Sequence, residues 1–434
     1  MHRDTDQWTT LLHQGQLDTQ LRQLYGAGEG VIGVQRKRYE ELILTHHKHF
    51  PHSGYIRLFS TPGRTELAGN HTDHNHGKVI AASVNLDAIA AVSATADEKV
   101  RFYSVDLDQE FEVDLGFLDV HPGEKGTTNA LIRGVAAWFA ANNKKIGGFN
   151  ATVQSQVLQG SGLSSSACIE VLLATVFDCL FNDLSTNPVD RAICGKYAEN
   201  DYFGKPSGLM DQMACSVGGI IGIDFSQPDQ PRITRITADF HSAGYQLAII
   251  DTKSDHVGGD DQYASIPLEM KQVAQQIGAS VLGDGDPALF WERFSQLRAL
   301  LPGRALARAA HFFQENARVD HMIKYLQTKP ADIPSWLAMV SQSGNSSFKY
   351  LQNVIDDPVH QDYALALMAA DSFPSSHGKV VHRVHGGGFG GTIQVYVPLE
   401  EWDKFVHWMD GLIAPGCVIP LEIRDYGSIE VTAG

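Results

Sequence analysis

The stretch GNHTDHNHG, residues 69–77, gathers three histidines, one aspartate and two asparagines. Such a set suits a transition-metal site, a loop held by Asn and Asp turn hydrogen bonds, or a surface that binds a polar substrate. A zinc site needs ligands that converge tetrahedrally, usually from more than one segment, and no cysteine lies nearby. The chain also holds 19 histidines, so chance clusters are common. We therefore disfavour the metal site and leave the other two roles open.

A glycine-serine turn, QGSGLSSSACIEV at residues 159–171, is the most informative segment. Gly160 and Gly162 allow the backbone to approach a ligand closely, and serines 164–166 then open an apolar helix. Backbone N–H groups at a helix N-terminus bind anions, and serine hydroxyls add donors and a ligand for Mg²⁺. The segment lacks the Gly-Lys-Ser/Thr of a Walker A loop. It predicts a phosphate site, with an ordinary serine N-cap as the alternative.

Two carboxylates, Glu199 and Asp211, lie in AENDYFGKPSGLMDQMA, residues 198–214. A carboxylate near a helix N-terminus is often only a cap. In phosphoryl transfer, one carboxylate accepts or orients the proton of the attacking hydroxyl and another holds Mg²⁺. The residue types alone leave both interpretations open.

A second glycine cluster, HGGGFGG at residues 385–391, holds five glycines in seven residues. A turn needs fewer. Either this backbone lies against something flat or charged, or it packs against another loop.

Apolar periodicity indicates the elements that position these residues. Helices are expected within 1–50, at 127–142, after the glycine-serine turn up to residue 181, at 188–204, and repeatedly within 268–370. Strands are expected at 54–64, where the strand runs into a loop, and at 78–95, 99–115, 148–157, 216–225 and 246–252. The acidic, proline-bearing stretch 226–234 is the expected boundary, which gives a helical extension (1–50), an N-terminal domain (51–227) and a C-terminal domain (228–434).

Composition bounds the function. The chain of 434 residues carries a net charge of −16, which argues against nucleic-acid binding because that function uses basic surfaces. Five cysteines without a CxxC pattern indicate reduced thiols. The N-terminus has no signal-peptide pattern, and no apolar run is long enough to span a membrane. We expect a cytoplasmic protein without nucleic-acid or membrane partners.

Four motifs together resemble the GHMP kinases: STPGRTELAGNHTDHNHG, GSGLSSSA, KPSGLMDQ and GGGFGGT occur in the order of that superfamily, over roughly residues 55–400. The first resembles the galactokinase signature, a Gly-Arg followed by Gly-Glu-His-Thr-Asp-Tyr-Asn. The resemblance implies an α+β, two-domain GHMP kinase fold with the active site in the cleft between the domains. It implies transfer of the ATP γ-phosphoryl group to the C1 hydroxyl of a galactose-like sugar, with Mg²⁺. Monomers are common in this family, but the sequence does not decide the oligomeric state.

The resemblance also implies roles for individual residues. Asp211 matches the catalytic base, and Arg64 matches the arginine that stabilises the nucleophile and the phosphoryl group. Ser166 and Glu199 match the Mg²⁺ ligands. The phosphate cradle matches Gly160, Ser161, Gly162, Leu163, Ser164, Ser165 and Ser166. The sugar contacts match Arg64, Asn70, His71, Asp73, Gly208, Asp211 and Tyr263, the last placed seven residues after His256 as in the family.

The chain departs from the family at four places, one of which is YASIPLEM from Tyr263 on, where the family has an arginine pair. Asn70 stands where the family has a glutamate that contacts the far end of the sugar, near O6. Asparagine is neutral and can donate, so we hypothesise a pocket that tolerates a C6-oxidised sugar such as galacturonate or is less strict at C6. His74 replaces a tyrosine, and Thr128 stands where a tryptophan often stacks on adenine, so the nucleotide preference stays open. The alternatives to galactose are therefore galacturonate, N-acetylgalactosamine, or a catalytically silent sugar sensor on the same fold.

Overall fold

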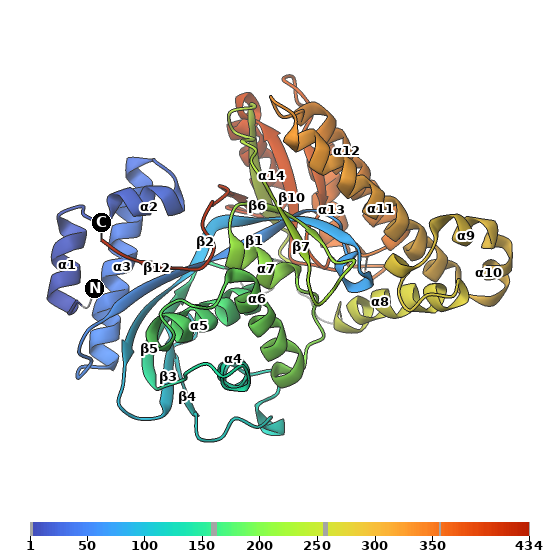
Figure 1. The fold of residues 1–434 in the computed structure, drawn as a ribbon. Helices are drawn as coiled ribbons and strands as arrows, with labels where there is room; N and C mark the ends of the chain where they lie inside the picture. The colour runs from blue at the N-terminus through green and yellow to red at the C-terminus, as the bar shows by residue number, and fades with distance from the viewer. Residues whose placement is uncertain (1–2, 158–162, 255–258, 356, 434) are drawn as a thin grey trace.

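Two β-sheets organise the chain in the computed structural model, which describes residues 3–157, 163–254, 259–355 and 357–433 (Figure 1). The first sheet has eight strands and the second has four. Helices cover both sheets, so the expected α+β class is confirmed. Within the described residues, no helix is long and apolar enough to cross a membrane.

The first sheet has the order β12-β1-β2-β5-β3-β4, and a hairpin of β6 and β7 pairs with β2. Its strands are β1 (Arg57–Ala68), β2 (Lys78–Ala94), β3 (Lys99–Ser104), β4 (Gln109–Asp114), β5 (Phe149–Ser155), β6 (Ile220–Asp224), β7 (Arg232–Ile236) and β12 (Ile429–Val431). The β-branched run at 78–95 forms one long strand. Its first part pairs with β6 and its last part with β5. Among the described strands of this sheet, only β3 and β5 run parallel.

Alternation along β2 separates the two faces of this sheet. Ala88, Ala90 and Val92 join the main core, whereas Ile89 and Ala91 pack under the N-terminal helices. The helices on the core face are α4 (Thr128–Ala141), α5 (Ser165–Phe181), α6 (Pro188–Tyr197) and α7 (Met210–Val217) (Figure 1). The first three of these begin in segments that the periodicity predicts to be helical, and α7 follows the turn at Pro206 and Gly208.

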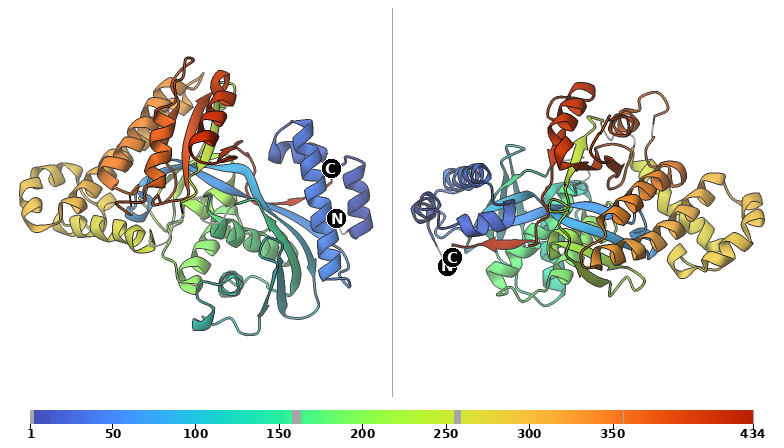
Figure 2. Two further views of the ribbon diagram at one scale, coloured as in Figure 1. Left: turned by 180° about the vertical axis from the view of Figure 1, so that it is seen from behind. Right: turned by 90° about the horizontal axis from the view of Figure 1, so that it is seen from above.

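The N-terminal extension forms α1 (Thr5–His13), α2 (Asp18–Tyr25) and α3 (Glu29–His49), as expected. Gly15, with a φ of 70°, separates the first two helices. All three pack on the outer face of the first sheet (Figure 1). The C-terminal strand β12 reaches the same end of the molecule (Figure 2), and the Thr432 N–H donates to the Gln20 side chain at 2.8 Å.

The second sheet is fully antiparallel, in the order β11-β8-β10-β9. Its strands are β8 (Tyr245–Asp251), β9 (Val381–Val384), β10 (Thr392–Pro398) and β11 (Val418–Pro420). One face packs on α11 (Gly303–Gln327) and α12 (Ile333–Ser346), and the other on α13 (Asp362–Asp371) and α14 (Trp402–Leu412). A helical arm projects beside them, formed by α8 (Gly259–Gln276), α9 (Pro287–Glu292) and α10 (Phe294–Leu300) (Figure 2).

Two expected boundaries differ in the structure. The boundary at 227/228 falls between β6 and β7, which pair over Ile220–Asp224 and Arg232–Ile236. The first sheet therefore extends at least to Ile236 and later recruits β12. The strand expected at 54–64 does not run into a loop there, because β1 continues through Pro62 and Gly63 to Ala68 with register shifts at Pro62/Arg64 and Glu66/Ala68. Such bulges redirect side chains, here next to Arg64.

Candidate active site

Arg64 and Asp211 form a bidentate ion pair at the centre of the site. Arg64 Nε donates to Asp211 Oδ1 at 2.7 Å, and Nη2 donates to Oδ2 at 2.9 Å. The arginine side chain is 4% exposed and the aspartate side chain 33% exposed, so the carboxylate has an open edge. Burial alone would raise the pKa of Asp211, but the Arg64 charge and the hydrogen bonds from Arg64 and Ser164 hold it below its ordinary value. Asp211 is therefore a carboxylate at neutral pH.

The start of α5 lies against this pair. Ser164 has a left-handed backbone (φ 61°), precedes the first helical residue, and donates its hydroxyl to Asp211 Oδ2. The Leu163 side chain is buried, and its carbonyl accepts from the Arg64 N–H at 3.2 Å. Ser165 and Ser166 open the helix, so their N–H groups belong to the free N-terminal set. Gly160, Ser161 and Gly162 lie outside the described residues.

Ser166 and Glu199 lie close enough to share a cation. Ser166 Oγ donates to Glu199 Oε1 at 2.8 Å, and Gln212 Nε2 donates to the other carboxylate oxygen at 2.8 Å. Glu199 belongs to a π-helical turn, Ala198–Phe203, that extends α6. Such turns within helices often occur at functional sites. A hydroxyl and a carboxylate fit Mg²⁺, which takes one or two protein ligands and completes its shell with water and phosphate oxygens. Among the described residues, no group of three His, Cys, Asp or Glu side chains could hold a metal by itself.

The loop of residues 69–77 presents a cluster of aromatic rings, and it is called the substrate loop below because the family resemblance implies sugar contacts there. His71 and His74 stack at 5.9 Å between ring centroids, and the Tyr263 ring lies 5.0 Å from His71. The Tyr263 hydroxyl and His74 Nε2 are hydrogen-bonded at 3.1 Å. Asp73 lies against Gly208, where a Cβ would come 1.9 Å from its carboxylate oxygen. A side chain at position 208 would therefore displace the Asp73 carboxylate from its present place.

His71 is held in an unusual conformation. Its φ is 61°, in the left-handed region, and its Nε2 hydrogen-bonds the Gly387 carbonyl at 2.9 Å. Burial, followed by the charge of His74, lowers the pKa of His71 to about 3, so the ring is neutral. A carbonyl accepts, so the proton is on Nε2.

Asn70 corrects an expectation. We expected its side chain to face the sugar, but it is 0% exposed. Its amide nitrogen donates to both oxygens of Glu66 and to the Gly386 carbonyl, and its oxygen accepts from Ser347 and Asn353. The hydrogen-bonding capacity of this amide is used inside the protein.

The glycine-rich loop, residues 385–391, packs against another loop, which was one of its two expected roles. Asn70 and His71 of the substrate loop bond the carbonyls of Gly386 and Gly387. Four of its glycines have positive φ: Gly386, Gly388, Gly390 and Gly391. At Gly388 a Cβ would come 2.1 Å from the Asn353 carbonyl, so no other residue fits there.

Sequence patterns missed several polar residues that support the site. They are Glu66, Gln212, Ser347, Asn353, Arg383 and His385, which are all nearly fully buried. Glu66 carried a signal, because a charged residue in an otherwise buried strand needs a partner, and Arg383 supplies it. Gln212 directly follows Asp211. No periodicity or motif points to Ser347 or Asn353.

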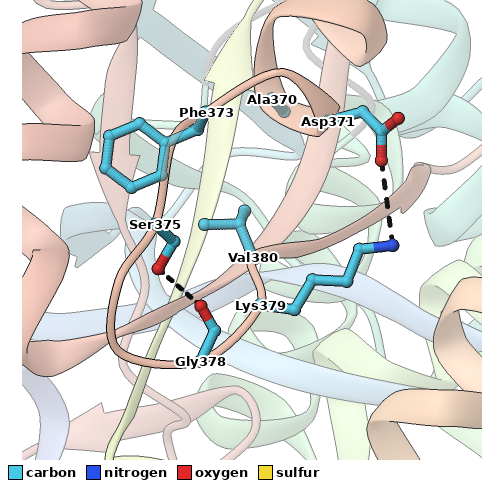
Figure 3. A pocket seen from close by; sticks show the side chains of 7 residues that line it. All are labelled: Ala370, Asp371, Phe373, Ser375, Gly378, Lys379 and Val380. Carbon is cyan, nitrogen blue, oxygen red and sulfur yellow. Dashed lines mark hydrogen bonds and ion pairs between the residues drawn. The ribbon is translucent and has the colours of Figure 1, made fainter.

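A separate hollow of about 290 Å³ lies at the start of β9, at the opposite end of that strand from the glycine-rich loop. It is lined by the segment from Ala370 to Val380, and Lys379 points toward Asp371 across it with 3.9 Å between the charged atoms (Figure 3). None of the expected site residues lines it.

Comparisons with known proteins agree with this geometry. The galactokinase galactose-binding signature matches residues 44–94, and the GHMP kinase N-terminal domain matches residues 130–219. A galactokinase of Actinobacillus pleuropneumoniae is 30% identical over 358 residues, 82% of this chain and 88% of the relative. A galactokinase of Streptomyces coelicolor is 29% identical over 91% of this chain and 96% of the relative.

Solved structures give the same fold. The crystal structure of Lactococcus lactis galactokinase complexed with galactose superposes with a TM-score of 0.76 at 22% identity, covering 90% of this chain and 99% of that one. Methanococcus jannaschii mevalonate kinase superposes with a TM-score of 0.59 at 14% identity, covering 84% and 98%. Together with the sequence relatives, these matches show that the chain is a sugar kinase of the galactokinase family, within the GHMP kinases.

Proposed function

We propose that this enzyme uses ATP to phosphorylate the anomeric (C1) hydroxyl of galactose, giving galactose 1-phosphate and ADP. The observation that carries the proposal is the paired Arg64 and Asp211 at the N-terminus of α5, next to the substrate loop. Relatives named galactokinase support the sugar and the phosphoryl donor.

In this proposal Asp211 is the base. Its ionised carboxylate accepts the C1 hydroxyl proton while the sugar oxygen forms a bond to the γ-phosphorus and the bond from that phosphorus to the β-phosphate bridging oxygen breaks. The electron pair of that bond leaves with ADP. Arg64 holds the carboxylate and stabilises charge on the nucleophile and the phosphoryl group, with little reorganisation because it is already fixed by Asp211.

The N–H groups of Ser165 and Ser166 would bind ATP phosphate oxygens, as the N-terminus of a long helix favours anions. Ser166 and Glu199 would hold Mg²⁺, which neutralises phosphate charge in such sites. His71, Asp73, Gly208 and Tyr263 would surround the sugar. Asn70 has no free donor or acceptor for it, so its role is indirect.

Two further sugars stay open as alternatives. The Asn70 side chain is buried and bonded inside the protein, so its lack of charge does not act on C6 directly. Galacturonate remains the alternative substrate because residue 70 departs from the family, and N-acetylgalactosamine is a further relative to test. A sugar sensor is disfavoured because the base, the arginine and the Ser164–Ser166 run are all assembled.

ADP release with a panel of galactose, galacturonate and N-acetylgalactosamine tests these functions. Turnover of galactose supports the proposal, and preferred turnover of galacturonate replaces the sugar but keeps the chemistry. Saturable sugar binding without ADP would identify a sensor. We place the activity in the cytoplasm as part of the proposal, consistent with five cysteines that are all unpaired.

A further inference from the structure

We infer that Glu66 and Asn70 act as a positioning pair that fixes the substrate loop to the glycine-rich loop, so that residue 70 serves the sugar site without touching the sugar. The inference rests on the proposed function, because it assigns the substrate loop to sugar binding. It gives the departure at position 70 a structural purpose in this chain.

Asn70 is the hub of the pair. Its Nδ2 lies 3.1 and 3.2 Å from the two Glu66 oxygens and 2.6 Å from the Gly386 carbonyl. Its Oδ1 accepts from Asn353 Nδ2 at 2.7 Å and from Ser347 Oγ at 3.1 Å. An amide is the one side-chain group of this size that both donates and accepts in this way. A carboxylate at position 70 would face the Glu66 carboxylate and the Gly386 carbonyl with no proton to offer.

Glu66 is complementary to that amide. It comes from β1, is 1% exposed, and forms an ion pair with Arg383 of β9, which is fully buried. The pair thus joins a strand of the first sheet to a strand of the second. A buried arginine needs its carboxylate, so the negative charge belongs at position 66 and the neutral donor at position 70.

The glycine-rich loop, held by Asn70, also contacts the rings of His71 and Tyr263. The Gly387 carbonyl accepts from Asn353 Nδ2 at 3.2 Å and is hydrogen-bonded to His71. A Cβ on Gly387 would come 2.8 Å from the Tyr263 ring, so that ring lies directly on the loop backbone. A shift of residues 386–387 would therefore move His71 and Tyr263 together, and both line the proposed sugar site.

Two nearly isosteric substitutions test the pair. Asn70→Asp removes the donor and opposes two carboxylates, whereas Glu66→Gln removes the charge but supplies an amide. In the double variant the new amide at position 66 can donate to the new carboxylate at position 70, and one negative charge stays near Arg383. We expect Asn70→Asp to raise the KM for the sugar about tenfold or more, with a smaller loss of kcat. The KM of the double variant should be at least about threefold lower than that of Asn70→Asp. Additive effects, with no recovery, would overturn the inference.

A second probe avoids the substrate loop in case Asn70→Asp does not fold. Asn353→Ser removes the donors to Asn70 and Gly387 from a residue outside the sugar site, and we expect it to raise the sugar KM as well. Asn345→Ala is the matched control, because this exposed asparagine bonds the Ser341 carbonyl of its own helix. An unchanged KM in Asn353→Ser would count against the pair.

The test separates failure of the inference from failure of the proposed function. The wild-type protein is assayed first for ADP release with galactose, and no turnover with any sugar would refute the function. Thermal unfolding midpoints of the four proteins in the Glu66/Asn70 cycle then still measure the coupling. If the midpoints couple but the KM values do not, the pair is merely structural and the inference fails.

Discussion

Arg64 and Asp211 come from segments 147 residues apart and meet through two parallel hydrogen bonds, of 2.7 and 2.9 Å. Arg64 lies in an irregular stretch of β1, and Asp211 lies in the first turn of α7. The two bonds fix the plane of the Asp211 carboxylate, and the Ser164 hydroxyl donates to its Oδ2. The arrangement keeps Asp211 ionised and oriented before a substrate arrives, as the proposed role of base in phosphoryl transfer would require.

The role of base proposed for Asp211 gives the most direct prediction. Asp211→Asn keeps the side-chain shape but cannot take a proton, so we expect kcat to fall by about 10²–10⁴-fold. Sugar binding, measured by calorimetry, should persist. Asp224→Asn is the matched control, since Asp224 pairs with the exposed Arg232 at 2.8 Å. An active Asp211→Asn enzyme would remove this residue from the role of base.

The magnesium assignment predicts a shift in metal dependence. Glu199→Gln should raise the Mg²⁺ concentration for half-maximal activity by about tenfold or more, because it removes the one charged ligand proposed for the ion. Ser166→Ala should act in the same direction. Asp201→Asn, an exposed change in the same π-helical turn, is the control. The assignment fails if Glu199→Gln loses activity without any change in Mg²⁺ dependence.

The fold was predictable where the signal is local. Small, apolar and β-branched residues at 78–95 predict one or two buried strands, and the structure has the single strand β2 (Lys78–Ala94). Serines after two glycines predict the start of α5. The continuation of β1 through Pro62 and Gly63 was not predictable, because the pairing of Arg57–Pro62 with β2 residues 87–92 overrides local turn chemistry.

The site was predictable in its residue types and less so in their roles. Motif order indicated Arg64 and Asp211, although no spacing rule brings them together. Asn70 shows the limit: its partners Ser347, Asn353 and Gly386 lie 277, 283 and 316 residues away. Its identity suggested a change of substrate contact, whereas the partners that occupy its amide emerge only from the tertiary structure.

The hydrogen bond between His74 and Tyr263 leads us to expect that its loss weakens sugar binding. His74→Phe keeps a ring beside His71 but loses the hydrogen bond to Tyr263, so we expect the sugar KM to rise by about 3–10-fold with kcat less affected. Tyr263→Phe should match it, and the double variant should be no worse than either. His76→Asn, in the same loop but bonded to Asp284, is the control. Additive losses in steady-state kinetics would contradict the shared bond.

The N-terminal extension predicts a stability effect without a kinetic one. Asp87, fully buried, binds Arg38 Nη1 of α3 at 2.6 Å, the Tyr25 hydroxyl of α2 at 2.6 Å and Arg424 Nη1 at 3.3 Å. Asp87→Asn leaves two buried guanidinium groups without a counter-charge, so the free energy of unfolding should fall by about 3–5 kcal/mol. Urea unfolding measures it.

A matched exposed pair controls that experiment. Asp97 pairs with Arg101 at 2.6 Å with its side chain 45% exposed, so Asp97→Asn should cost less than about 1 kcal/mol. The kcat of folded Asp87→Asn should stay near that of the wild type at 25 °C. Equal losses of stability in the two variants would show that the extension is not anchored through Asp87.

His46 predicts how stability depends on pH. It is fully buried in α3, between the hydroxyls of Thr152 and Ser93 at 3.1 Å each, and burial, followed by the charges of neighbouring histidines, lowers its pKa to about 3. The ordinary histidine pKa is about 6.5, so between these values the unfolded chain binds a proton that the folded chain does not.

The free energy of unfolding should therefore fall as pH drops below about 6.5, with His46 contributing about 1.4 kcal/mol per pH unit. His46→Gln should flatten the dependence of urea-derived stability on pH between pH 4.5 and 6 by about one proton relative to wild type. His52→Gln, an exposed histidine outside α3, is the control and should leave the slope intact. Equal slopes for wild type and His46→Gln would mean that the buried ring is not the source of the pH dependence.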